Sequence, residues 1–318
     1  MNLRKHNLSK LLNNYSHYKK IDHNLSIPGE AEKYVLVNPK NPQTRYIVKA
    51  PKKCGEVETI TEYLINCIGM AIPGLNISKS IIGYVKVDPL KADSIYQTRF
   101  MSFIFHNEDE RLAHGLQLFQ NFYSEQELIR AEKRPEERNI YTVENIKSAI
   151  ELLYSHSYKR IFLEFIDLCL FDALIGNQDR HAKNWGVLEP IRVSGIGKER
   201  FAPIFDTARG FLWNIPDEKL NKYLEKQQLV SYVLKCRPEI SVVNNPKINH
   251  FELIRYLIGM DNEYASRIEN LLKNMENIDI DSIFRQRVFI IGLSGLRRFL
   301  IKECFKLRLQ KLKEVIAR

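Results

Sequence analysis

With 318 residues, the chain is long enough for one two-lobed domain or for two ordinary domains. A hydrophobic fraction of 44% beside 27% charged residues excludes a disordered chain, and no apolar run of about 18 residues predicts a membrane span. The net charge of +10 favours an anionic partner, such as nucleic acid, an anionic surface or a phosphorylated ligand.

The cysteines and the N-terminus indicate the compartment. Five scattered cysteines without a CxxC pair predict neither a disulfide framework nor a zinc site. The basic N-terminus lacks the continuous apolar segment of a secretory signal. We therefore expect a cytoplasmic protein that does not bind a membrane.

The first hundred residues predict a small sheet with one helix. Runs rich in β-branched and aromatic residues predict strands at 33–37, 45–50, 77–87 and 94–105. The turn residues "NPKNPQT" make the first two strands a hairpin. Helical periodicity predicts a helix over 57–72, which ends at "PG".

After residue 106 the pattern becomes helical. Helices are expected at 110–122, 125–134, 143–155, 159–175, 217–235, 249–258, 262–275 and 280–316. Two short strands, 185–188 and 200–205, interrupt them as a hairpin. The predicted fold is α+β and two-lobed, with a small β-rich N-lobe (1–105) and a larger, otherwise all-helical C-lobe (106–318).

The C-terminal segment 297–318 is strongly basic, with eight Lys and Arg against two Glu. One interpretation is a docking face for an acidic partner or for nucleic acid. The other is an amphipathic helix with a solvated basic face, because apolar residues recur at helical spacing. That apolar face would contain Phe299, Leu300, Phe305, Leu309 and Leu312.

A polar loop, "GNQDRHAKN", follows the apolar helix predicted at 159–175. Asp179 and Asn184 lie five residues apart, and Asp206 follows the hairpin. A carboxylate in this position can accept a proton from an attacking hydroxyl, while an amide oxygen and a second carboxylate hold Mg²⁺. Protein kinases use the same D-x4-N…D order. The alternative is a hydrogen-bonded loop that ties two elements together.

The N-lobe contains candidates for the other half of a phosphate site. Lys49 ends a predicted strand, Glu62 lies on the following helix where it can pair with Lys49, and Gly29 precedes the first strand. Each residue alone is also typical of a solvated surface. The sequence has neither a G-x-G-x-x-G nor a Walker A motif.

Together these motifs resemble the HipA-type serine/threonine kinases, the toxin family of bacterial persistence modules. "SIPGEAEKYVLV", "YIVKAP" and "TEYLINCIG" resemble the family's phosphate loop, lysine strand and helix. "LFDALIGNQDRHAKNWGVL" and "FAPIFDTARGFLWN" resemble its catalytic loop and metal-binding strand. The order agrees from about residue 26 to 214, which implies a protein-kinase-like fold.

The resemblance implies a role for each matching residue. Asp179 would be the catalytic base. The positions of His181 and Lys183 on the same loop, rather than the resemblance, suggest that His181 braces the loop and that Lys183 contacts the transferred phosphate. Asn184 and Asp206 would bind Mg²⁺. Lys49 and Ser26 would bind the phosphates of ATP, and the positions of Glu62 and Gly29 add them to the expected ATP site. Ser26 would also be the autophosphorylated serine, and Pro28 replaces the second serine that some members carry.

The resemblance also implies partners. The long HipA form has an extra N-terminal subdomain, for which the segment before Ser26 is too short. The chain therefore resembles the short HipT-like form, in which that subdomain is a separate small protein. HipB-like and HipS-like antitoxins are then the expected partners, with DNA reached only through an antitoxin. The family's targets imply a protein substrate such as an aminoacyl-tRNA synthetase.

Two other functions remain open from the sequence. Phosphoinositide kinases carry a similar D-R-H-x-x-N loop, and a positive charge suits an anionic membrane. A non-catalytic module that acts with a DNA-binding partner would use the basic C-terminal helix instead of the loop.

Overall fold

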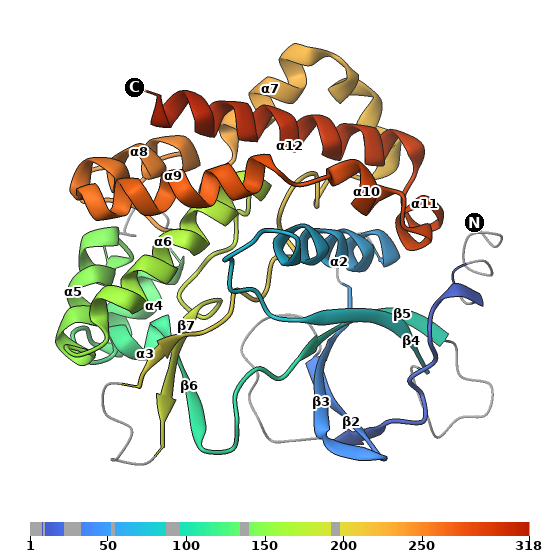
Figure 1. The fold of residues 1–318 in the computed structure, drawn as a ribbon, viewed down its shortest axis with the longest axis horizontal. Coiled ribbons are helices and arrows are strands. Elements are labelled where there is room, and N and C mark those ends of the chain that lie inside the picture. Colours follow the sequence, from blue (N-terminus) through green and yellow to red (C-terminus); the bar gives the residue numbers. More distant parts are fainter. Residues whose placement is uncertain are drawn as a thin grey trace.

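The computed structural model describes residues 8, 10–21, 33–51, 55–86, 96–133, 140–191 and 198–317. These residues form a small part built on an antiparallel sheet and a larger part built mainly of helices (Figure 1). The predicted two-lobed α+β architecture is confirmed.

The small part contains five described strands in the order β1-β2-β3-β5-β4. They are β1 (Lys19–Ile21), β2 (Lys33–Asn38), β3 (Asn41–Lys49), β4 (Ser80–Lys86) and β5 (Tyr96–Phe103). The predicted hairpin is β2–β3, but its turn is shorter than expected because β3 already begins at Asn41. Lys33 and Lys49 pair across this hairpin. Since paired residues point to one face of a sheet, both amines lie on the same side.

The helix predicted at 57–72 is α2 (Glu56–Met70), which lies across the small sheet (Figure 1). Ile60, Leu64 and Ile68 are fully buried, as the helical periodicity predicts. α2 also contacts α10 (Ile280–Phe284) and α11 (Arg287–Gly292) of the larger part, where Ile60 packs against Gly292. The larger part therefore fixes the orientation of α2.

A second, three-stranded sheet lies in the larger part, formed by β6 (Glu110–His114), β7 (Gly186–Pro190) and β8 (Arg200–Phe201). The predicted hairpin is β7–β8. The helix predicted over 110–122 is wrong: residues 110–114 form β6, and only Gly115–Phe119 is helical, as α3. β6 pairs with β7, which lies more than 70 residues away in the sequence, so the local pattern of residues 110–114 could not predict this strand.

The central helix of the larger part is α6 (Tyr158–Ile175), which packs against several of the remaining helices and whose side chains from Phe165 to Ile175 are all buried. The remaining helices are α4 (Glu125–Lys133), α5 (Val143–Leu153), α7 (Lys226–Lys235), α8 (His250–Met260), α9 (Asn262–Glu276) and α12 (Gly295–Ile316), with a 3-10 helix at Asp217–Leu224. The single helix predicted at 280–316 is three helices. Ser294 caps the N-terminus of α12 through the backbone N–H of Arg297, which starts a new helix there.

The basic C-terminal helix is α12, which runs along the edge of the larger part (Figure 1). Its positive charges are not all solvated, because Arg297 and Arg308 are each 1% exposed. Arg308 donates to the carbonyls of Ala173 and Val233 and thereby ties α12 to α6 and α7. Phe299, predicted on the buried face, is instead 51% exposed. None of the described helices has the length and apolarity needed to cross a bilayer.

Candidate active site

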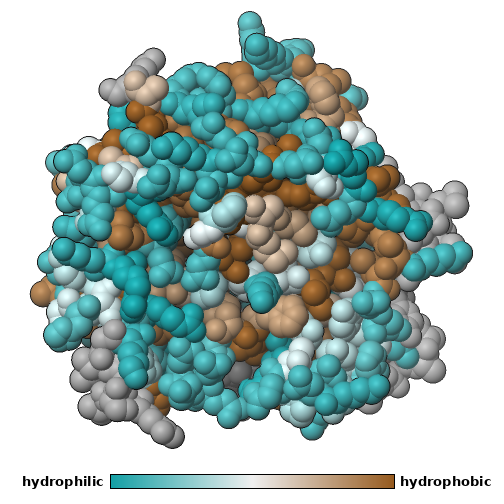
Figure 2. Space-filling view, viewed as in Figure 1, coloured by the Kyte–Doolittle hydropathy of each residue, from teal (hydrophilic) through white to brown (hydrophobic). Residues whose placement is uncertain are grey.

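A cavity of about 530 Å³ lies between the two parts, with side chains of both in its lining. Figure 2 shows a mostly hydrophilic face in which apolar side chains gather near the centre, between the small sheet and the helices. Seven of the nine predicted site residues line this cavity: Lys49, Glu62, Asp179, His181, Lys183, Asn184 and Asp206. Ser26 and Gly29 lie outside the described residues.

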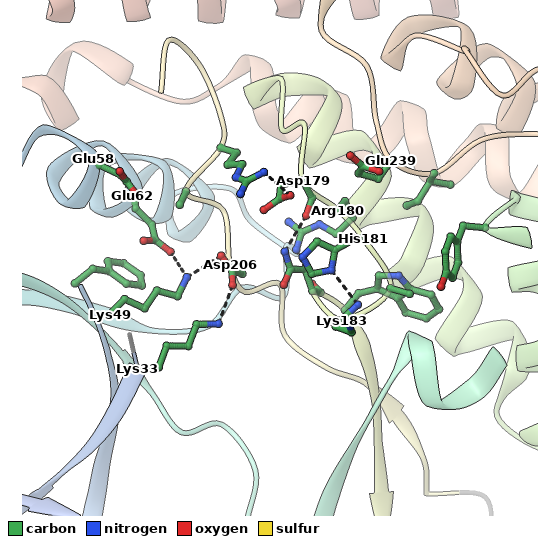
Figure 3. Close-up of a pocket in the computed structure, with 18 of the residues that line it drawn as sticks. Lys33, Lys49, Glu58, Glu62, Asp179, Arg180, His181, Lys183, Asp206 and Glu239 are labelled. Atoms are coloured by element: carbon green, nitrogen blue, oxygen red, sulfur yellow. Dashed lines mark hydrogen bonds and ion pairs between the residues drawn. The ribbon is translucent and has the colours of Figure 1, made fainter. Parts of the chain in front are cut away.

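Lys49 is the centre of a charged cluster (Figure 3). Its Nζ donates to Glu62 Oε1 at 2.7 Å and to Asp206 Oδ1 at 2.8 Å. Burial alone would lower the pKa of Lys49, but these carboxylates raise it above its usual value. Lys49 is therefore held as a cation, and the predicted Lys49–Glu62 pair is present.

Lys33 completes this cluster, although no motif in the sequence points to it. Its Nζ donates to Asp206 Oδ2 at 3.3 Å. Burial lowers the pKa of Lys33. Burial alone would raise the pKa of Asp206, but the charges of Lys49 and Lys33 lower it well below its usual value. The pairing of Lys33 with Lys49 in the predicted hairpin could have identified Lys33, because paired residues place both amines on one face of the sheet.

Asp206 occupies an unusual backbone conformation, with φ of 55°. Non-glycine residues in the left-handed region cost free energy and cluster at functional sites, although aspartate tolerates it better than most. Phe205 before it stacks on Phe105, with ring centroids 5.6 Å apart. The Phe205 carbonyl also accepts a hydrogen bond from Arg180. Both contacts fix the turn that directs the Asp206 carboxylate into the cavity.

Arg180 is the internal support of the polar loop. It is 1% exposed and binds both oxygens of Asp172 on α6, at 2.7 and 2.9 Å. Its Nη1 donates to the carbonyls of Asn184 and Phe205, each at 2.6 Å. One guanidinium thus connects α6, the loop and the turn before Asp206.

The loop begins where α6 ends, at Gly176 with φ of 69°. A side chain at this position would be strained in that conformation and would meet the buried Arg308. The buried Asn177 then donates to Asp172 and accepts from the backbone N–H of Asp179. These contacts hold the backbone of Asp179 in place.

Asp179 presents its carboxylate to the cavity and contacts Arg209, whose Nη1 lies 2.8 Å from Asp179 Oδ1. Burial raises the pKa of Asp179 to about 6, even though Arg209 lowers it. Arg209 also lies over the ring of Trp213. No pattern in the sequence assigned Arg209 to the base, because the contact joins two loops that only the fold brings together.

The amide of Asn184 is oriented by the loop itself. Its Nδ2 donates to the Asp179 carbonyl at 2.8 Å, so the amide oxygen is the atom left for a metal. Asn184 and Asp206 together offer hard oxygen ligands, which fits Mg²⁺ that completes its shell with phosphates and water. In the described part of the chain, no group of three or more His, Cys, Asp or Glu side chains is arranged to bind a metal ion.

His181 and Lys183 lie on the same loop and line the cavity (Figure 3). His181 Nδ1 accepts from the backbone N–H of Lys183 at 3.2 Å. This contact shapes the loop between Asp179 and Asn184. The contact of Lys183 with a transferred phosphate stays a prediction.

Comparisons with known proteins agree with this site. The family model of the HipA-like C-terminal domain matches residues 25–278, which include every predicted site residue. The chain belongs to this family. As a HipA-like domain it carries the D-x4-N loop and the following aspartate within the matched region. A comparison with curated proteins gives no match.

Solved structures show the fold of this HipA-like domain. It is similar to the crystal structure of the Helicobacter pylori proinflammatory kinase CtkA, with a TM-score of 0.73, 19% identity, and 95% of this chain and 96% of that chain covered. A golgi casein kinase aligns more weakly, with a TM-score of 0.40, 10% identity, and 98% and 76% of the chains covered. The similarity to CtkA shows that the chain has a kinase-like fold.

Proposed function

We propose that this protein is an ATP- and Mg²⁺-dependent serine/threonine protein kinase. The observation that carries the proposal is the arrangement in one cavity of Lys49, bound to Glu62 and Asp206, opposite a loop that presents Asp179 and Asn184. Phosphoryl transfer needs positioning and charge stabilisation more than covalent chemistry, and these groups supply both.

In this proposal the charged cluster is the donor side. Lys49 and Lys33 bind phosphate oxygens, and Glu62 keeps Lys49 oriented. Asn184 and Asp206 would hold Mg²⁺, which neutralises charge on the transferred phosphoryl group when bound. Arg180 keeps Asn184 and the turn before Asp206 at a fixed separation through its two carbonyl contacts.

Asp179 is the proposed general base. A serine or threonine hydroxyl beside it donates its proton to the carboxylate as the hydroxyl oxygen bonds to the γ-phosphorus of ATP, and the bond from that phosphorus to the bridging oxygen breaks so that ADP leaves. A pKa of about 6 leaves Asp179 mostly ionised at pH 7, yet basic enough to take this proton.

We further propose that the protein is the toxin component of a HipBST-type toxin–antitoxin system, with HipB-like and HipS-like antitoxins as partners. This assignment rests on the family membership and the sequence motifs. A translation component such as an aminoacyl-tRNA synthetase is the proposed substrate, and Ser26 the proposed autophosphorylation site. Phosphoproteomics of cells that express the wild type or Asp179→Ala would identify substrates; unchanged phosphopeptides would contradict this assignment.

The kinase proposal is tested with γ-labelled ATP and Mg²⁺ in vitro. We expect label on protein serine or threonine with the wild type and none above background with Asp206→Asn. Vesicles that contain phosphoinositides serve as a second acceptor. Label on the lipid alone would contradict the proposal and favour a lipid kinase, and no transfer to either acceptor would contradict kinase activity.

A further inference from the structure

The cavity has two chemically different ends. Lys33, Lys49, Glu62 and Asp206 line the donor end, and the loop from Asp179 to Asn184 lies between the ends (Figure 3). The other end, here the apolar end, is lined by Ala131, Tyr141, Ile146, Trp185 and Ile240, with Glu239 beside them.

The apolar end is preformed rather than assembled from surface side chains. Its five apolar residues are at most 8% exposed. The ring of Trp185 packs on Phe165 and stacks on Phe201, and Tyr141 packs edge-on against Phe119. Gly115 lies so close to the indole that any side chain there would overlap it.

Main-chain hydrogen bonds close the wall that carries Glu239 and Ile240. Ser241 donates its N–H to the Tyr141 carbonyl at 3.1 Å and accepts from the N–H of Val143 at 2.9 Å. These bonds tie the segment after α7 to the start of α5. The width of the apolar end is therefore set by backbone contacts.

The charges of the apolar end differ in sign from those a phosphate needs. The two lysines of the charged cluster line the donor end. Glu239 contributes a carboxylate beside the apolar residues, and His181 and Lys183 of the loop lie between the two ends. Glu239 lines the same cavity as Asp179, and Figure 3 shows its carboxylate on the side of the loop away from the two lysines of the charged cluster. An anionic headgroup or a nucleic acid is disfavoured beside Glu239, whereas a cationic side chain is favoured.

We propose that the apolar end is the acceptor subsite and binds a polypeptide segment with an apolar side chain near the target serine or threonine and a basic side chain facing Glu239. The inference rests on the proposed kinase function and specifies its substrate class. Phosphate donor and acceptor then approach Asp179 from opposite ends of one cavity.

The test is a peptide array centred on serine, in which each flanking position is varied, read both for peptide binding and for phosphate transfer. We expect the wild type to prefer a large apolar residue over alanine by at least about tenfold in kcat/KM at one flanking position. A second position should prefer Lys or Arg. The KM for ATP is measured in parallel as a control for the donor end.

Two variants should change this preference in defined ways. Glu239→Lys should replace the preference for Lys or Arg by one for Asp or Glu. Ile240→Ala should move the apolar preference to a larger side chain, and Ile240→Val provides a milder change if the alanine variant unfolds. The matched controls are Glu269→Lys, an exposed charge reversal on α9, and Ile290→Ala, which truncates an isoleucine that is 45% exposed.

Unchanged peptide preferences in both variants would overturn the inference. A change that falls on the KM for ATP would also overturn it, since the apolar end would then hold part of the nucleotide. Selective peptide binding without phosphate transfer would support the subsite and contradict the kinase proposal, so the two failures are distinguishable.

Discussion

The two sides of the site hold their functional groups in opposite ways. On the donor side, Lys33, Lys49, Glu62 and Asp206 contact one another directly, at 2.7 to 3.3 Å. On the loop side, Asp179 also pairs with Arg209 at the cavity. The backbone of the loop, however, is held from beneath by the buried Arg180, which bonds to Asp172 and to the carbonyls of Asn184 and Phe205.

This difference separates ion pairs that must change partners when ATP binds from contacts that must keep the loop in place. Ion pairs that line a cavity can exchange one anionic partner for another, so Lys49 and Lys33 can shift from Asp206 to phosphate oxygens. The contacts of Arg180 are buried and directional, and a charge-assisted bidentate pair of this kind holds its geometry. We therefore expect changes to Lys33, Lys49 and Glu62 to act mainly on ATP affinity, and loop-side changes to act on folding and on kcat. Asp206, as a proposed metal ligand, should affect transfer itself.

The largest effect should come from Arg180→Met. It leaves the buried Asp172 without its counter-charge, which costs about 3–5 kcal/mol of unfolding free energy, and it releases the Asn184 and Phe205 carbonyls. Urea denaturation measures the loss. Adding Asp172→Leu should restore much of the stability but not the activity, whereas a loss below about 1 kcal/mol in the single variant would show that the loop does not depend on this pair.

A smaller effect is expected from Glu62→Gln on the donor side. Lys49 keeps Asp206 but loses its second carboxylate, so its orientation toward phosphate weakens. We expect the KM for ATP to rise about tenfold, equivalent to about 1.4 kcal/mol, with kcat within about threefold of the wild type. Steady-state kinetics separates the two constants, and a fall in kcat at unchanged KM would contradict the division between the two sides.

The smallest effect concerns pH. Because Asp179 must be ionised to accept a proton and has a pKa of about 6, kcat/KM should fall as the pH drops through about 6. Arg209 lowers this pKa, so Arg209→Met should move the acid limb to higher pH. Arg255→Met, which removes an exposed arginine of α8, is the control. An acid limb that moves to lower pH in Arg209→Met would contradict the ion pair as the cause.

Much of the architecture could be predicted from local patterns. The β2–β3 hairpin carries a strong turn signal, α2 carries helical periodicity and α6 is a long apolar run. Their predicted positions agree with the structure within a few residues. Residues 110–114 could not be assigned this way, because β6 exists only through its pairing with β7. The basic face of α12 was overestimated for a similar reason, since partners on α6 and α7 bury Arg308.

The residues of the site likewise divide into those that sequence motifs predict and those that only the fold reveals. Lys49, Glu62, Asp179, Asn184 and Asp206 were predicted from motif order, and the structure brings them to one cavity. Lys33 and Arg209 were missed because a lone lysine or arginine carries no role until the fold places a carboxylate beside it. The predicted roles of Ser26 and Gly29 concern residues that the structure does not describe.

The central claim is that Asp179 is the base of a phosphoryl transfer at this cavity. Single-turnover transfer of γ-labelled phosphate at saturating ATP, with the nucleotide Kd measured by calorimetry, compares the wild type with Asp179→Asn. We predict a nucleotide Kd within about threefold of the wild type and a transfer rate lower by about 10²–10⁴. Transfer by Asp179→Asn at the wild-type rate would contradict the account.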